Sequence, residues 1–165
     1  MRTSTIMSLT AVGLLVGCAG PGGDRGTSAD ASAGESIGVR LAATRANTGE
    51  TGQVILTPRG EKTDVTVQVS GVPQHSTRPV HLYTYIHEGT CDNLSPAPAY
   101  TLTDRVLAES LNMFPTMAKA GPPFKVSNTA PVALATLDSR PHAIQVRTAP
   151  ADGNVDIFCG EIGRR

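Results

Sequence analysis

The sequence predicts an all-β fold, an antiparallel Greek-key β-sandwich or flattened barrel of about eight strands. Two observations indicate this class. The 165 residues include 17 glycines and 12 prolines, a density that favours short strands and turns over long helices. Between these turn residues, short segments alternate apolar and polar side chains, which is the pattern of half-buried strands.

The individual strands follow from this alternation. Val65, Val67 and Val69 fall on one face of a segment that ends in a Ser-Gly turn. Residues 80–87 place apolar side chains on one face of a strand and histidines and tyrosines on the other. The predicted strands are residues 37–41, 53–57, 64–70, 80–87, 131–137, 142–147 and 154–159, and residues 106–113 fit either a strand or a helix. A proline-rich loop is expected over residues 90–105.

The N-terminus has the features of an export signal. Arg2 gives a positive start, and the apolar run 6–16 is too short to span a bilayer. The run ends in Leu15-Val16-Gly17-Cys18, which resembles a bacterial lipobox. That resemblance implies removal of residues 1–17 and lipid attachment at Cys18, so that the lipid makes the membrane a partner. The alternative is an ordinary secretory signal with an incidental cysteine.

The segment after the lipobox suggests where the protein works. Ala19 stands where an aspartate would resemble an inner-membrane retention signal, so the resemblance implies the outer membrane, with the protein facing the periplasm. Residues 18–36 are rich in Gly, Ala, Ser and Asp, and are predicted to be a flexible tether with a mean span of roughly 20–25 Å. Residues 37–165 then form the folded domain.

The charge balance of the chain argues against one class of partner, nucleic acids. The chain has 14 Lys and Arg against 14 Asp and Glu, so it lacks the basic footprint of a nucleic-acid-binding protein. No nucleic-acid partner is therefore expected. The sequence leaves open which protein or small ligand the domain binds.

Two cysteines remain once Cys18 is assigned to the lipid. Cys91 and Cys159 are expected to pair in an oxidising periplasm. Their bridge would close a loop of about 69 residues, which the chain-entropy model equates with about 4 kcal/mol of stability. The alternative is a pair of reduced, buried cysteines.

Three short motifs carry a family resemblance. They are Val69-Ser-Gly-Val-Pro73, Ile86-His-Glu-Gly-Thr-Cys91 and Cys159-Gly-Glu-Ile-Gly163. In this order they resemble the copper/zinc superoxide dismutase family, and in particular a divergent branch of small bacterial lipoproteins. The related CHRD domain is a competing identification. The resemblance implies the β-sandwich and matches Cys91 and Cys159 to the family disulfide.

The family's metal ligands mostly do not carry over. Tyr85 stands at the first histidine of the copper strand, His87 keeps the second, and Arg147 falls on the late-strand histidine. Asp156 replaces the arginine that guides superoxide, and no histidine lies between residues 91 and 141. Redox copper needs several converging imidazoles. No catalytic residue and no cofactor are therefore predicted, and His87 is the one remaining metal-ligand candidate for copper.

The surviving polar residues support two interpretations. His87, Tyr85 and Arg147 can form a vestigial ligand site that binds an anion or a carboxylate. The simpler interpretation is a polar remnant of a lost copper site, with His87 hydrogen-bonded to a loop. His75 and His142 are expected to be solvated surface residues.

Three functions follow from these residues. The first is an envelope-anchored, non-catalytic lipoprotein that serves as a binding or structural module. The second is a superoxide dismutase-type enzyme with a rebuilt site that combines His87 with His75 or His142. The third is a copper-binding protein without turnover. The small number of convergent histidines favours the first.

Overall fold

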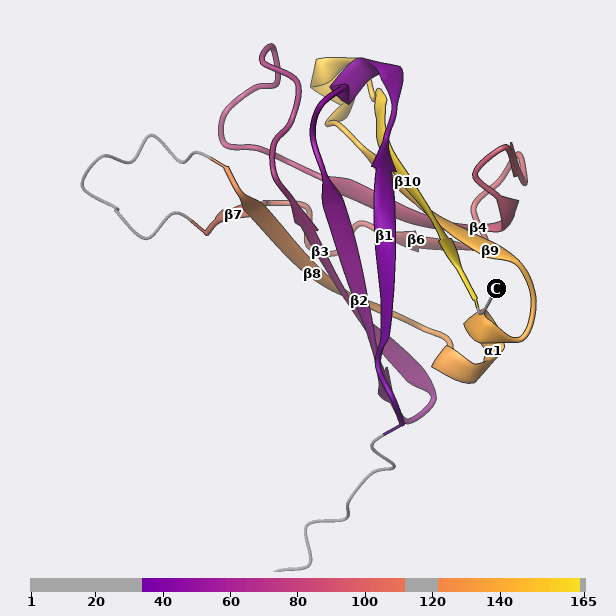
Figure 1. The fold of residues 1–165 in the computed structure, drawn as a ribbon. Helices are drawn as coiled ribbons and strands as arrows, with labels where there is room; N and C mark the ends of the chain where they lie inside the picture. Colours follow the sequence, from indigo (N-terminus) through magenta and orange to yellow (C-terminus); the bar gives the residue numbers. More distant parts are fainter. Residues whose placement is uncertain (1–33, 112–121, 164–165) are drawn as a thin grey trace, which may run out of the picture.

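Strands dominate the computed structural model, which describes residues 34–111 and 122–163 (Figure 1). The predicted all-β class is confirmed. The strands in these ranges are β1 Ile37–Ala43, β2 Gly52–Arg59, β3 Lys62–Val69, β4 Tyr83–Thr90, β5 Asn93–Leu94, β6 Tyr100–Leu102, β7 Glu109–Ser110, β8 Phe124–Ala130, β9 His142–Arg147 and β10 Asp156–Ile162. The predicted signal 1–17, Cys18 and most of the tether lie outside the described residues.

The ten strands join into one antiparallel sheet within the described ranges. Its order is β5-β4-β9-β10-β1-β2-β3-β8-β7, with β6 also paired to β4. Strand β1 belongs to both halves, because Ile37–Leu41 pairs with β2 while Ala42 and Ala43 pair with β10. One half thus contains β1, β2, β3, β8 and β7, and the other contains β10, β9, β4, β5 and β6 (Figure 1).

A single apolar core holds the two halves together. Phe124 from β8 and Phe158 from β10 are its largest fully buried side chains. The alternation predicted for residues 64–70 is confirmed, since Val65, Val67 and Val69 are each 1% exposed. Burying an aliphatic or aromatic side chain of this size contributes about 1.5–3 kcal/mol. The fold therefore depends mainly on one face of each long strand.

Residues 131–137 are not the predicted strand. The apolar residues there form the short helix α1, Leu134–Asp138, in which Leu134 and Leu137 share the buried side. A spacing of three residues places two side chains on one helical face. The Thr63 hydroxyl donates to the carbonyl oxygen of Val132 at 2.8 Å and fixes the approach to the helix. No helix in the described ranges is long and apolar enough to cross a membrane.

Strand β8 was not predicted. Phe124 and Val126 are buried and alternate with partly exposed neighbours, but the next inward position is Asn128, which interrupts the apolar pattern. Its side chain accepts from the Arg105 backbone N–H at 3.1 Å and donates to the Arg105 carbonyl at 2.8 Å. Because these bonds satisfy the amide, a polar residue can occupy a core-facing strand position.

The predicted strand 80–87 begins later, at Tyr83. Val80 and Leu82 are still buried and still connected to a neighbouring segment: the Leu82 N–H donates to the Val106 carbonyl at 2.7 Å, and the Ala108 N–H donates to the Val80 carbonyl at 2.9 Å. Of residues 106–113, those described contain the two-residue strand β7 and a bridge between Leu107 and His81. Residues 112 and 113 lie outside the described ranges.

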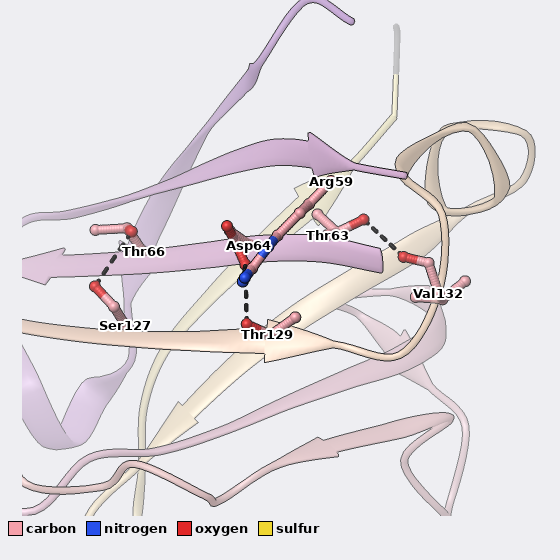
Figure 2. Close-up of polar contacts among 7 residues, drawn as sticks. All are labelled: Arg59, Thr63, Asp64, Thr66, Ser127, Thr129 and Val132. Atoms are coloured by element: carbon pink, nitrogen blue, oxygen red, sulfur yellow. Dashed lines mark hydrogen bonds and ion pairs between the residues drawn. The ribbon is translucent and has the colours of Figure 1, made fainter. Parts of the chain in front are cut away.

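The outer face of β2, β3 and β8 carries cross-strand polar contacts (Figure 2). The Asp64 carboxylate accepts from Arg59 at 3.1 Å and from the Thr129 hydroxyl at 2.9 Å, and Thr66 and Ser127 lie 3.3 Å apart. Such pairs contribute modestly to sheet stability. These polar groups bond to one another across the strands, so the contacts on this face stabilise the sheet.

Candidate functional site

The candidate site lies on the outer face of β4. Tyr85 and His87 are same-face neighbours, and their ring centroids lie 6.4 Å apart at a tilt of 60°. Alternation directs Ile86 between them into the core. His87 is nevertheless only 7% exposed. Something other than the core must therefore cover the imidazole.

The segment after β4 supplies that cover. Strand β5 folds back on β4, with Gly89 opposite Leu94, and the Ser95 N–H donates to the Glu88 carbonyl at 2.9 Å. The imidazole Nδ1 of His87 lies 2.9 Å from the Ser95 carbonyl oxygen. A carbonyl oxygen only accepts, so Nδ1 carries the proton and donates. The hydrogen bond between His87 and a loop, expected in the simpler interpretation, is thus present.

The predicted disulfide fixes the same segment. Cys91 is bonded to Cys159 in β10, with Cα atoms 5.9 Å apart. The bridge connects the start of the covering segment to a strand two positions away in the sheet, since β9 lies between β4 and β10. Together the disulfide and β5 hold residues 91–95 over His87.

Arg147 lies apart from His87. Register places it opposite Tyr83 in β4 and opposite Asp156 in β10, whereas His87 lies opposite Ala143. Four residues of β9 therefore separate it from the histidine, a distance of about 13 Å. Its Nε atom forms an ion pair with the Asp156 carboxylate. The structure thus brings Tyr85 and His87 together, but it does not bring Arg147 to His87.

The prediction for His142 was wrong: its side chain is 1% exposed. The imidazole Nδ1 lies 3.1 Å from the Leu137 carbonyl oxygen and 3.0 Å from that of Arg140. The ring thus bonds the Leu137 carbonyl in the last turn of α1, which has no partner within the helix, and the Arg140 carbonyl just after the helix. The sequence offered no signal for this role, because the helix itself was expected to be a strand.

The histidines do not converge on one point. His142 is opposite Glu88 in the register and Ala143 is opposite His87, so the two imidazoles project from opposite faces of the sheet. His75 is exposed in the turn between β3 and β4, as expected. Over residues 34–111 and 122–163, no three His, Cys, Asp or Glu side chains gather closely enough to hold a metal ion. The residues present therefore do not fit a copper site of converging imidazoles.

Two glycines of the family-resemblance motifs lie where the backbone leaves no room for a side chain. Gly89 has φ +102°, and a Cβ there would lie 2.2 Å from the Asn93 carbonyl oxygen. A Cβ on Gly160 would lie 2.6 Å from the Arg40 carbonyl oxygen, where β10 meets β1. Both positions need a residue without a side chain. The motifs thus mark close backbone approaches around the disulfide.

The motif Val69-Ser-Gly-Val-Pro73 is also explained by packing. The Ser70 hydroxyl donates to the Glu50 carboxylate and accepts from the Thr51 N–H at 2.8 Å. A Cβ on Gly71 would meet that same carboxylate. The buried Asn47 amide donates to the Gly71 carbonyl at 3.2 Å. This motif closes the end of the sheet and presents no reactive group.

Comparison with known proteins adds no relative, because no family model, no curated protein and no solved structure matched the chain.

Proposed function

We propose that this protein is an envelope-anchored lipoprotein whose superoxide dismutase-like domain is a non-catalytic binding or structural module. The observation that carries the proposal is the hydrogen bond from His87 Nδ1 to Ser95 under the disulfide-held segment. The one histidine that matches the family's copper ligands is covered by the protein's own chain.

The other matching positions support the same conclusion. Tyr85 and Arg147 stand where the resemblance assigns copper-ligating histidines, and the Arg147 guanidinium pairs with Asp156. Asp156 in turn stands where the resemblance assigns the arginine that guides superoxide. Tyr85, Arg147 and Asp156 therefore supply neither the imidazole ligands of copper nor, because Arg147 is paired with Asp156, an uncompensated positive charge for an anionic substrate.

The strand order supports a Greek-key sandwich of the superoxide dismutase type. β3 pairs with β8 and not with β4, so the chain crosses from β3 to the other half of the sheet before it returns, and the last strand, β10, lies beside β1. Crossing connections of this kind are typical of Greek-key sandwiches. The single core between the two halves of the sheet fits two layers packed face to face.

Metal content tests the lack of catalysis. The full chain carrying Cys18→Ala, equilibrated with copper and zinc and then desalted, is expected to hold well below one metal ion per chain. It should also give no dismutase rate above that of buffer, and His87→Ala should change neither value, with His75→Ala as the exposed-histidine control.

One copper per chain that His87→Ala removes, together with dismutase activity, would overturn the proposal in favour of a rebuilt enzyme. Copper that binds at micromolar concentration without turnover would instead identify a copper-binding protein.

The anchor is tested separately. In a bacterial host, the wild-type chain is expected in the detergent-rich phase, and Cys18→Ser is expected to move it into the aqueous phase. Several acyl chains give stable anchoring and a chain without them has none. Ala19→Ser is the matched control and should behave as wild type. Equal partitioning of the wild type and Cys18→Ser would contradict lipid attachment at this residue.

A further inference from the structure

The segment that covers His87, residues 91–95, is attached to the sheet by few contacts. Strand β5 has two residues, which pair with Gly89 and Thr90 of β4. From residue 91 to residue 99, a stretch that the structure describes throughout, no residue is buried and none belongs to the apolar core. A short hairpin without core contacts is at best marginally stable by itself. The covering segment therefore depends on the disulfide more than on packing.

The disulfide lies on the outer face of the sheet. In the register, Cys159 of β10 is opposite Gln145 of β9, which is opposite Tyr85 of β4. Residues directly opposite one another project from the same face of a sheet, so Cys159 shares the face that carries Tyr85 and His87. Cys91 and Cys159 are both partly exposed. The bridge is thus at the surface, where a thiol in solution can reach it while the core stays closed.

The imidazole of His87 is the group that the covering segment conceals. It is 7% exposed, and its Nδ1 donates to the Ser95 carbonyl. With the proton on Nδ1, Nε2 keeps the lone pair of the neutral ring, which can accept a hydrogen bond or react with an electrophile. The Tyr85 ring is its neighbour, at 6.4 Å between centroids. Removal of the cover would therefore add an imidazole acceptor beside a tyrosine on this face.

We propose that the bridge between Cys91 and Cys159 is a redox switch that controls access to His87. With the bridge intact, the covering segment is closed and shields the imidazole. A dithiol reductant opens it, because one thiolate attacks a sulfur of the bridge to form a mixed disulfide, and the second thiol then releases the protein as two free thiols. The reductant supplies two electrons and two protons and leaves as a disulfide.

The sheet keeps this change local. Strand β4 stays paired with β9 from Tyr83 to Glu88, and β10 stays paired with β9 and β1. The released segment retains its few backbone bonds to β4, so it opens by local fluctuation while the core remains folded. The switch requires neither lipid attachment nor the lack of copper, and is thus independent of the function proposed above.

Carbethoxylation by diethyl pyrocarbonate, followed for each histidine by peptide mass spectrometry, tests the switch in the full chain carrying Cys18→Ala. In the oxidised protein, His87 should react about tenfold more slowly than the exposed His75. After reduction with dithiothreitol, capping with iodoacetamide and desalting, the rate at His87 should rise about tenfold. The rate at His75 should not change. An unchanged rate at His87 would overturn the proposal.

His142 distinguishes local opening from unfolding. It is 1% exposed, and its ring is bonded to the carbonyl groups of Leu137 and Arg140 rather than to the covering segment. It should stay unreactive in the reduced protein, and an equal rise at His87 and His142 would refute a local switch. Reoxidation of uncapped protein with oxidised glutathione should restore the slow rate at His87, and failure to restore it would contradict a reversible device.

Two variants assign the effect to the bridge. The double variant Cys91→Ser and Cys159→Ser should show the fast rate at His87 both with and without dithiothreitol. Asp92→Ala changes an exposed residue of the covering segment and leaves the bridge intact, so it should keep the slow rate. A slow rate in the double variant, or a fast rate in oxidised Asp92→Ala, would mean that the bridge does not control the cover.

Discussion

Replacing both Cys91 and Cys159 with serine is expected to lower the free energy of unfolding by about 4 kcal/mol. The two cysteines are 68 residues apart in the sequence, and the bridge restricts the unfolded chain over that whole length. It also fixes the segment that covers His87. Urea denaturation of the double variant and of the wild type gives the difference directly.

Two controls isolate the bridge. Cys18→Ser changes a cysteine outside the disulfide and should leave the denaturation midpoint unchanged. Dithiothreitol should lower the midpoint of the wild type toward that of the double variant and leave the double variant unaffected. A double variant as stable as the wild type would mean that the bridge adds nothing to the fold.

Gly89→Ala is the second large effect, an expected loss of about 3 kcal/mol. A methyl group at this position would lie 2.2 Å from the Asn93 carbonyl oxygen, and the φ of +102° disfavours any side chain. The hairpin between β4 and β5 must shift to accommodate it. We therefore also expect the Ser95 carbonyl to move away from His87, which a changed imidazole NMR resonance would report.

Gly163→Ala separates the two causes of that loss. Gly163 has φ +121° but nothing within 4 Å of an added Cβ, so its substitution should cost only the backbone strain, about 1 kcal/mol. Gly38→Ala lacks both the positive φ and the contact and should be close to neutral. If the losses for Gly89→Ala and Gly163→Ala were equal, the close approach to Asn93 would have no energetic importance.

Alternation identified strands in which apolar residues face the core at every second position. Residues 64–70 and 142–147 are examples, because Val65, Val67, Ile144 and Val146 are buried at every second position. Alternation did not identify β8, because a polar residue occupies one of its core-facing positions. Asn128 faces the core and is satisfied by Arg105, a contact between segments 23 residues apart. Local pattern contains no information on such a partner.

The arrangement of the candidate site was also predicted only in part. The sequence placed Tyr85 and His87 on one strand face, and the structure confirms that they are neighbours. It did not indicate that Arg147 lies opposite Tyr83 and Asp156, because register between strands depends on the whole sheet. The buried His142 was missed for a related reason, since its partners are carbonyl groups at the end of α1.

Residue pattern and spacing were sufficient to predict the all-β class, and the cysteine count favoured the pairing of Cys91 with Cys159 over two reduced cysteines. Short-range periodicity, turn residues and cysteine count are sufficient for these features, because each depends on residue type and spacing alone. The cover of Ser95 over His87 and the ion pair between Arg147 and Asp156 became visible in the folded protein alone. These features depend on contacts between distant segments, which form only when the complete sheet closes around its core.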